Sequence, residues 1–327
     1  MRTDVAPMRI SVVIPVYRGA TTLEAVVGEL APYATGGTTP AGRPYVVDEL
    51  LLVHDCGPDA SDAVIERLAQ AWPFVRPVWL SRNFGQHAAT LAGMASTTGD
   101  WVATIDEDGQ QDPADLGAML DLATERSLQL VYGQPVNPPP HGWLRNACSR
   151  AAKRIASGFL GSDQVTHFNS FRLVDGEIAR TLAAYCGNGV YLDVGLSWIT
   201  ARTGRSPVRL RAELGRPSGY SYLRLIGHFW NLVLTTGTRP LRLITLTGMA
   251  SVAFAVVIAV YAVYGKLAGD IPVQGWASLV IVVAFFSGAI LTALGVIAEY
   301  LAVTMGIAMG KPLYVIATKP TRGTGRS

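Results

Sequence analysis

Two long apolar runs near the C-terminal end constrain the fold of this chain more than any other feature. Residues 244–263 are 20 positions without a charge, and residues 276–298 are 23 such positions. A helix of about 20 apolar residues is long enough to cross roughly 30 Å of hydrocarbon. The alternative is a pair of buried core helices, but core helices usually keep a polar stripe and these runs have none. We therefore expect two transmembrane helices within residues 241–305.

The charges that flank these runs predict how the helical hairpin is oriented. The loop between the runs carries only Lys266 and Asp270 as charged residues. Basic residues instead lie outside the hairpin, at Arg239, Arg242, Lys311, Lys319, Arg322 and Arg326. Because Lys and Arg are enriched on the cytoplasmic side, both ends of the hairpin are expected there. The N-terminal part is expected on the same side, since Asp4 interrupts any signal-peptide pattern.

The overall composition agrees with a membrane protein and argues against nucleic acid as a partner. Half of the residues are hydrophobic and 16% are charged, whereas a soluble domain carries about 25% charged residues. The net charge of +3 is too small to indicate a nucleic-acid-binding surface.

The chain before the apolar runs has the pattern of an α/β domain. Short β-branched runs lie at residues 10–17, 50–53, 75–80, 101–105 and 128–132. Helical spacing occurs at residues 22–33 and 85–97, and further helices are expected after Asp59 and after Asp112-Pro113, where a carboxylate can cap the first turn. This alternation predicts an α/β domain with a mostly parallel sheet over residues 1–215.

Two amphipathic stretches lie outside this pattern, at residues 143–160 and 220–233. Both mix basic or aromatic residues with apolar ones, which suits the membrane interface. Packing against the sheet is the alternative. We expect residues 216–240 to form an interfacial segment and residues 306–327 to form a cytosolic tail.

The most distinctive polar motif is TIDEDGQQDP at residues 104–113. It places Asp106, Glu107, Asp108 and Gln110 directly after a predicted strand. In an open α/β sheet, ligands bind at the carboxyl ends of the strands. Oxygen ligands there suit Mg²⁺ or Mn²⁺, which leave coordination positions for phosphate oxygens. An acidic turn that is simply solvated is the alternative.

Five motifs in a fixed order identify a family resemblance. They are SVVIPVY at residues 11–17, LVHD at 52–55, LSRNFGQ at 80–86, DEDGQQDP at 106–113 and SFRL at 170–173. In the C-terminal half, TRPLRL at 238–243, EYL at 299–301 and KPLYVI at 311–316 follow. By these motifs the chain resembles the polyprenyl-phosphate glycosyltransferase branch of glycosyltransferase family 2, over nearly its whole length.

The resemblance implies a GT-A nucleotide-sugar domain and assigns roles to particular residues. The implied nucleotide-binding positions are Pro15, Val16, Tyr17, Asp55, Arg82 and Asp106. The implied cation, Mg²⁺ or Mn²⁺, is held at Asp108 and Gln110, and the implied catalytic residues are Asp106, Asp108 and Arg172. The implied ligands of the acceptor phosphate are Arg145, Arg150, Arg172, Arg216 and Ser221.

The chain departs from the family pattern at four places. Arg18-Gly19-Ala20 follows Tyr17 where a glutamate is usual, and His54 replaces the first of two adjacent aspartates. Ser170 stands where many members have an aspartate, and Tyr222 stands where many have a lysine. The implied metal positions are intact.

The sequence therefore predicts a metal-dependent, inverting glycosyltransferase at the cytoplasmic face of a bacterial plasma membrane. It would move a sugar from a nucleotide-sugar, expected to be UDP-linked, to a polyprenyl phosphate such as undecaprenyl phosphate. A phosphate acceptor is already anionic and needs no strong base, and arginine pairs bidentately with phosphate oxygens. The sequence does not indicate the oligomeric state, so a homo-oligomer stays an open alternative.

Two alternatives stay open, one among enzymes and one from another class of protein. A processive polysaccharide synthase usually carries a QxxRW motif and more spans, and this chain has neither. A non-catalytic membrane scaffold that kept a nucleotide-sugar fold is disfavoured by the intact Asp106, Asp108 and Gln110.

Overall fold

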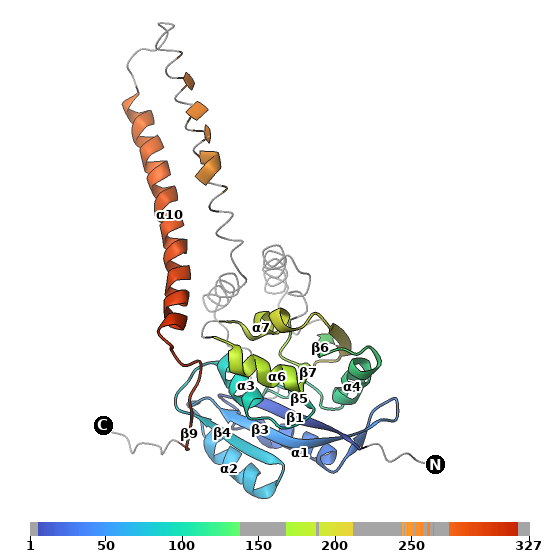
Figure 1. Cartoon of the computed structure of the whole chain (residues 1–327). Coiled ribbons are helices and arrows are strands. Elements are labelled where there is room, and N and C mark those ends of the chain that lie inside the picture. Colours follow the sequence, from blue (N-terminus) through green and yellow to red (C-terminus); the bar gives the residue numbers. More distant parts are fainter. Residues whose placement is uncertain are drawn as a thin grey trace, which may run out of the picture.

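Strand β1 (Met8–Val16) lies at the centre of a nine-stranded mixed sheet in the computed structural model of the chain (Figure 1). The structure describes residues 6–137, 168–187, 190–211 and 275–319, together with part of residues 244–264. Every residue of β1 from Ile10 onward is buried. A run of apolar, mostly β-branched residues without alternation is typical of a strand that is covered on both faces.

The sheet is parallel around β1, and β6 and β8 at one end are also parallel, whereas β7 and β9 run antiparallel to their neighbours. The other strands are β2 (Gly37–Thr38), β3 (Pro44–His54), β4 (Val75–Leu80), β5 (Trp101–Thr104), β6 (Leu130–Pro135), β7 (Arg172–Asp175), β8 (Thr203–Val208) and β9 (Ile316–Ala317). Their order is β8-β6-β7-β5-β1-β3-β4-β9, and the short β2 pairs with β3. Strand β7 runs antiparallel to β5 and β6, and β9 runs antiparallel to β4. The predicted parallel sheet is confirmed for β5-β1-β3-β4, but the whole sheet is mixed.

Helices cover both faces of the sheet. One face packs against α1 (Leu23–Ala34), α2 (Ser61–Ala71) and α4 (Asp115–Glu125). The other face packs against α3 (Gln86–Ala95), α6 (Gly176–Tyr185) and α7 (Leu192–Ile199). Along β1, Val12 and Ile14 enter the first core and Val13 enters the second, as the alternation of side chains along a strand requires.

The two predicted helix caps are wrong in detail. Helix α2 follows Ala60 and α4 follows Ala114, neither with a side-chain cap. Asp112 Oδ1 instead accepts the backbone N–H of Ala114 at 2.9 Å, so it closes a turn just before α4. Asp59 likewise accepts the N–H of Ala20 at 3.0 Å, which ties the turn before α2 to the loop after β1.

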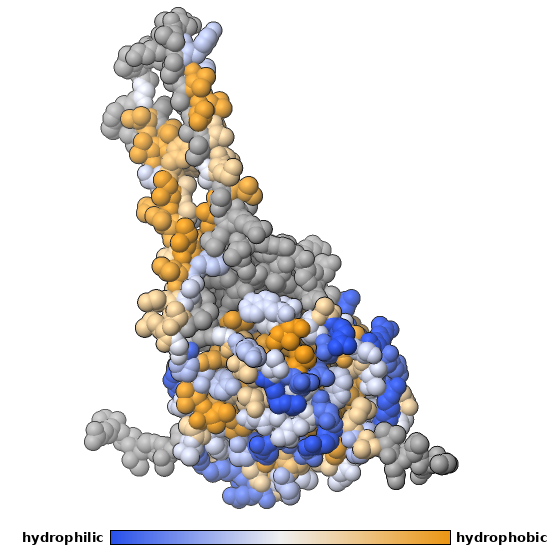
Figure 2. Space-filling model, in the orientation of Figure 1, coloured by the Kyte–Doolittle hydropathy of each residue, from blue (hydrophilic) through white to orange (hydrophobic). Residues whose placement is uncertain are grey.

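A 33-residue helix, α10 (Trp276–Ala308), contains the second predicted span and continues past its expected end. Within the described part of the chain, one helix is long and apolar enough to cross a membrane, at Phe285–Ala302. Apolar residues cover α10, whereas hydrophilic residues gather on the α/β part (Figure 2). The described residues between 244 and 264 are helical. The complete two-helix hairpin stays a prediction.

After α10 the chain returns to the edge of the sheet. Strand β9 pairs with β4, with Trp79 opposite Ala317 and Leu80 opposite Ile316. The N–H of Ser81 donates to the carbonyl of Val315 at 3.0 Å. This tail segment covers the edge of β4, which would otherwise leave unpaired backbone groups exposed.

Glu49 is a buried carboxylate in the middle of β3, and its partners come from three other segments. Ser11 Oγ donates to Glu49 Oε1 at 2.7 Å, and the backbone N–H of Thr98 donates to the same oxygen at 2.6 Å. The Arg76 guanidinium donates to Oε2. Burial alone would raise the pKa of Glu49, but these hydrogen bonds outweigh burial and hold that pKa below its ordinary value. The ionised form is therefore part of the folded structure.

We predict that Glu49→Gln lowers the free energy of unfolding at pH 7 by about 2 kcal/mol, because it leaves Arg76 without its charged partner. A carboxylate with a lowered folded-state pKa stabilises above its unfolded pKa, and this contribution disappears as the pH falls through the folded-state pKa. The difference between wild type and variant should therefore shrink below about pH 4. Urea unfolding of the detergent-solubilised protein, followed by tryptophan fluorescence, measures it.

The matched control is Asp48→Asn, the next residue, whose pair with Arg9 is exposed. Its effect should stay below about 1 kcal/mol. Equal losses in the two variants, or a Glu49→Gln effect that does not change with pH, would contradict this account.

Candidate active site

The carboxyl ends of β5, β1, β3 and β4 lie next to one another and bring the sequence motifs together. Val13 is opposite Thr104, and Val16 is opposite His54. From β1 the chain passes to β3 and β4 on one side, whereas β5 lies on the other side of β1. Such a reversal of strand order opens a crevice at the carboxyl edge, where α/β proteins bind ligands.

The end of β1 offers backbone groups and one exposed ring. Pro15 and Val16 are buried, but Tyr17 is 38% exposed. Gly57 makes room for this turn, because a Cβ at that position would lie 1.7 Å from the carbonyl oxygen of Tyr17. Cys56 has a φ of +48°, in the left-handed region, which is a strained conformation typical of functional turns. The Tyr17 ring is thus partly exposed at the strand end, with the Arg18 guanidinium 5.6 Å from its centre.

Asp55 holds the loop that follows β4. Its carboxylate accepts the backbone N–H of Phe84 at 2.7 Å and that of Gly85 at 2.8 Å. Gly85 has a φ of +93°, which favours glycine. Burial raises the pKa of Asp55, and the two N–H groups partly offset this effect. Arg82 lies exposed in the same loop, with its guanidinium 4.2 Å from the centre of the Phe84 ring.

Asp106 is the centre of a polar network that joins three loops. Gln86 Nε2 donates to Oδ1 at 2.7 Å, and Gln111 Nε2 donates to Oδ2 at 3.0 Å. Ser170 Oγ also donates to Oδ2. Burial raises the pKa of Asp106, and the hydrogen bond from Ser170 is the main opposing effect. The network fixes the orientation of the Asp106 carboxylate.

Glu107 joins the end of β5 to the end of β1. Its carboxylate accepts the backbone N–H groups of Tyr17 and Arg18, each at 3.0 Å. Burial is the largest influence and raises the pKa of Glu107 to about 7. Glu107 therefore shapes the crevice between β1 and β5 by fixing the backbone beside the exposed Tyr17 ring.

Asp108 and Gln110 fit a hard divalent cation that shares its coordination with phosphate. Asp108 Oδ1 accepts the N–H of Gln110 at 3.0 Å, so the two residues form one turn. Among the described residues, no three His, Cys, Asp or Glu side chains converge on a site that could hold a metal. Mg²⁺ is commonly held by one or two carboxylates and the phosphates of a substrate rather than by an all-protein cage. The donor set is of this kind.

Arg172 lies in a buried ion pair, away from solvent. Its Nε donates to Asp193 Oδ1 at 2.6 Å, and Nη2 donates to Oδ2 at 2.8 Å. Nη1 donates to Thr104 Oγ1 and to the carbonyl of Ser170, each at 3.2 Å. The side chains of Arg172 and Asp193 are 5% and 2% exposed. Arg172 therefore supports the strand ends beneath Asp106, and its predicted contact with phosphate stays a prediction.

Four of the predicted acceptor residues, Arg145, Arg150, Arg216 and Ser221, lie outside the described residues. The structure brings together the other predicted residues except Arg172, whose guanidinium is enclosed. Sequence reasoning placed Glu107 in the acidic cluster but gave it no role, and it missed Gln111 and Asp193 as parts of the site. Gln111 lies within the acidic motif and could have been found by its position. Asp193 belongs to no motif, and nothing in the sequence indicated its pairing with Arg172.

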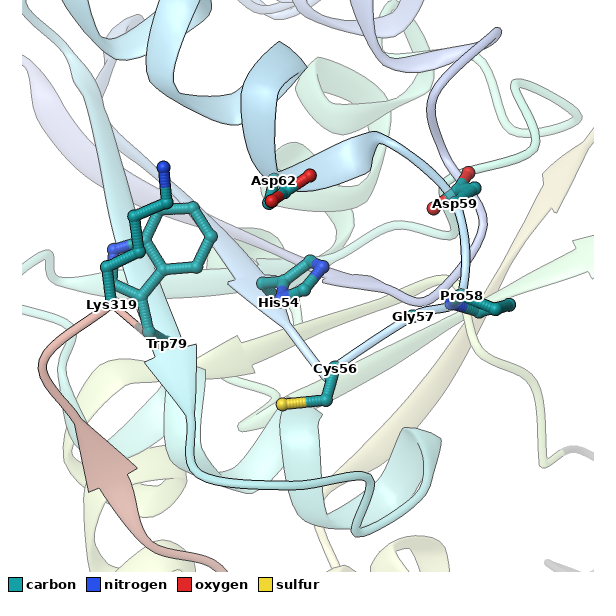
Figure 3. Close-up of a pocket in the computed structure, with 8 residues that line it drawn as sticks. All are labelled: His54, Cys56, Gly57, Pro58, Asp59, Asp62, Trp79 and Lys319. Carbon is teal, nitrogen blue, oxygen red and sulfur yellow. The ribbon is translucent and has the colours of Figure 1, made fainter. Parts of the chain in front are cut away.

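A pocket of about 300 Å³ adjoins the Asp55 turn on the α2 side of the sheet (Figure 3). Its lining residues are His54, Cys56, Gly57, Pro58, Asp59, Asp62, Trp79 and Lys319. The His54 and Trp79 rings meet edge to face, with centroids 5.3 Å apart. His54, which replaces an aspartate of the family pattern, thus lies on the opposite side of the turn from the Asp55 carboxylate.

Comparison with known proteins agrees with this geometry. The profile of glycosyl transferase family 2 matches residues 11–180, just over half of the chain. A bactoprenol glucosyl transferase of Shigella phage SfX is 24% identical over 95% of this chain and all of its own length. An undecaprenyl-phosphate 4-deoxy-4-formamido-L-arabinose transferase of Enterobacter sp. (strain 638) is 26% identical over 97% of this chain and 95% of its own.

A solved structure shares the fold. Glucosyl-3-phosphoglycerate synthase from Mycobacterium tuberculosis, in complex with Mn²⁺, UDP-glucose and phosphoglyceric acid, matches with a TM-score of 0.53 at 20% identity. The match covers 71% of this chain and 79% of that chain. The α/β part therefore has a GT-A-like fold with a mixed sheet. Taken with the family match and the acidic motif at the switch point, this means that the chain belongs to glycosyltransferase family 2 and is a glycosyltransferase.

Proposed function

We propose that the protein transfers a sugar from a nucleotide-sugar, most simply a UDP-sugar, to a polyprenyl phosphate at the cytoplasmic face of a membrane, with inversion at the anomeric carbon. The observation that carries the proposal is the acidic turn after β5, where Asp106 is immobilised and Asp108 and Gln110 form an adjacent oxygen-rich turn. This turn lies at the switch point of the sheet, where a diphosphate fits.

The acceptor is inferred from the relatives and from the apolar helix. Both relatives named above match over nearly their whole length, and their names specify bactoprenol and undecaprenyl phosphate. Helix α10 has the length and composition to lie in the same bilayer as a polyprenyl tail. A lipid phosphate is already ionised at neutral pH, so its oxygen can attack without a strong general base.

Each part of the site has a role in this reaction. The exposed Tyr17 ring stacks on the base, and Asp55 shapes the loop that carries Arg82 toward the nucleotide. Asp106 orients the donor through hydrogen bonds, and Asp108 with Gln110 holds a divalent cation. The cation, when bound, stabilises the negative charge that develops on the departing nucleoside diphosphate. The acceptor oxygen attacks the anomeric carbon from the face opposite to the leaving group.

The first test is transfer by the full-length protein in detergent, with radiolabelled UDP- and GDP-sugars, undecaprenyl phosphate, and Mn²⁺ or Mg²⁺. We expect transfer from one donor, abolished by a chelator. Asp108→Asn should lower kcat/KM at least about 100-fold, or ~2.7 kcal/mol of transition-state stabilisation. Asp48→Asn, at an exposed ion pair outside the site, should leave the rate unchanged. Absence of both transfer and nucleotide binding would refute the proposal.

A second prediction concerns Arg172 and Asp193, which we expect to act as one structural unit. Removing one partner leaves the other charge buried, so Arg172→Gln and Asp193→Asn should each cost about 3–5 kcal/mol of stability. The double variant should lose less than the sum, because it leaves no buried charge. Urea unfolding of the three variants measures the coupling.

The same variants test the earlier expectation that Arg172 binds phosphate directly. If it does, Arg172→Gln should remove transfer while leaving the free energy of unfolding near the wild-type value, and Asp193→Asn should have little effect. That combination would overturn the structural account of the pair.

A further inference from the structure

We infer that Arg211 is a positioning residue that holds the cation-binding turn in place and thereby sets the affinity of the site for its divalent cation. The inference rests on the proposed function only for the identity of that turn, which carries Asp108 and Gln110. Arg211 lies outside the sequence motifs, and it reaches the turn from the chain segment that follows β8.

Arg211 contacts the acidic loop at two points and anchors it to α1. Its backbone N–H donates to the carbonyl of Gln110 at 2.8 Å. Its guanidinium pairs with the Asp112 carboxylate. Nη1 of the same guanidinium donates to both carboxylate oxygens of Glu29 in α1, at 2.8 and 2.7 Å. One residue therefore ties the outer side of the loop to a helix that is packed on the sheet.

Two sets of contacts hold the loop: its own hydrogen bonds at Asp106 and Gln111, and the contacts of Arg211 with Gln110 and Asp112. The N–H of Asp106 donates to Gln111 Oε1 at 2.9 Å, which fixes the start of the loop near the network of Ser170. Gly109 has a φ of +71°, and regular helix begins only at Asp115. The Gln110 carbonyl and the Asp112 carboxylate face Arg211 on the other side. Both flanks of the turn at Asp108 and Gln110 are thus restrained.

The backbone at Arg211 is itself held in place. Asn137 forms two hydrogen bonds with Leu210, the residue before Arg211. Asn137 Nδ2 donates to the carbonyl of Leu210 at 2.8 Å, and the N–H of Leu210 donates to Asn137 Oδ1 at 3.0 Å. A side chain whose backbone is fixed loses less entropy when it binds. The Arg211 guanidinium therefore contacts Glu29 and Asp112 from a backbone that is already fixed.

The paired contacts at this position require an arginine rather than another positively charged side chain. The planar guanidinium offers several N–H groups in a fixed fork, so it can bind two carboxylates at once. An ammonium is a single point charge on a flexible stem and cannot reproduce both contacts with one geometry. Because Arg211, Glu29 and Asp112 are each a third or more exposed, the ion pairs contribute little to global stability. Their effect should appear in the local order of the turn.

The test compares Arg211→Gln and Arg211→Lys with a matched control, Arg43→Gln. Arg43 also bridges two carboxylates, the buried Asp121 at 2.6 Å and the exposed Glu125 at 3.4 Å, but toward the opposite end of α4. Mn²⁺ binding to the full-length protein with UDP present is measured by electron paramagnetic resonance, without acceptor lipid. Thermal unfolding of each variant is recorded in the same buffer.

We expect Arg211→Gln to weaken Mn²⁺ binding about 5–10-fold, roughly the effect of losing one orienting contact at a metal site. Arg211→Lys should restore part of the loss, and Arg43→Gln should change Mn²⁺ affinity less than about twofold while lowering the unfolding temperature at least as much. Unchanged Mn²⁺ affinity in Arg211→Gln, or equal weakening in Arg43→Gln, would overturn the inference.

Because no acceptor is present, this experiment separates the two proposals. If wild type binds Mn²⁺ with UDP and Arg211→Gln does so more weakly, the role of Arg211 stands even where sugar transfer to a lipid phosphate fails. If wild type shows no Mn²⁺ binding in the presence of UDP, the inference on Arg211 is refuted together with the metal-dependent reaction.

Discussion

The candidate site depends on one arrangement above all, the hydrogen bonding of the half-buried Asp106 carboxylate at the switch point of the sheet. Gln86 at the start of α3, Gln111 in the same loop as Asp106, and Ser170 just before β7 each donate to it. A buried carboxylate is tolerated only when hydrogen bonds replace its hydration. These hydrogen bonds hold the segments together at the strand ends and place Asp108 and Gln110 beside the crevice between β1 and β5.

The two ends of the C-terminal half of the chain both contact loops of this site. Arg211, the last residue described before the predicted interfacial segment, binds the loop between β5 and α4. On the return from α10, Val315 pairs with Ser81, the neighbour of Arg82 in the loop that Asp55 holds. Lys319 then forms an ion pair with Glu66 of α2 at 2.5 Å. The loop after β5 and the loop after β4 thus each contact chain segments that lead to or from the apolar helix.

Elements with a clear local sequence pattern could be predicted from the sequence. Features that depend on contacts between residues far apart in the chain could not. Residues 10–17 were recognisable as a strand because nearly the whole run is apolar. The first half of β3 was missed because Asp48 and Glu49 interrupt the pattern, and Glu49 is buried only through partners 27 to 49 residues away. The positions of Asp106, Asp108 and Gln110 at a strand end were predictable from strand alternation. The pairs Arg172–Asp193 and Arg211–Glu29 were not, because chain folding alone brings them together.

Ser170 shows how a departure from the family pattern can fit the same chemistry. Many members carry an aspartate at this position, whereas here the Ser170 hydroxyl lies beside the carboxylate of Asp106. A hydroxyl can donate to Asp106 Oδ2 and accept from Gln111 Nε2 at 2.9 Å, as it does in this structure. An ionised aspartate could only accept, and would add a third negative charge to the same loop cluster. The serine therefore lets Asp106 stay oriented by hydrogen bonds alone.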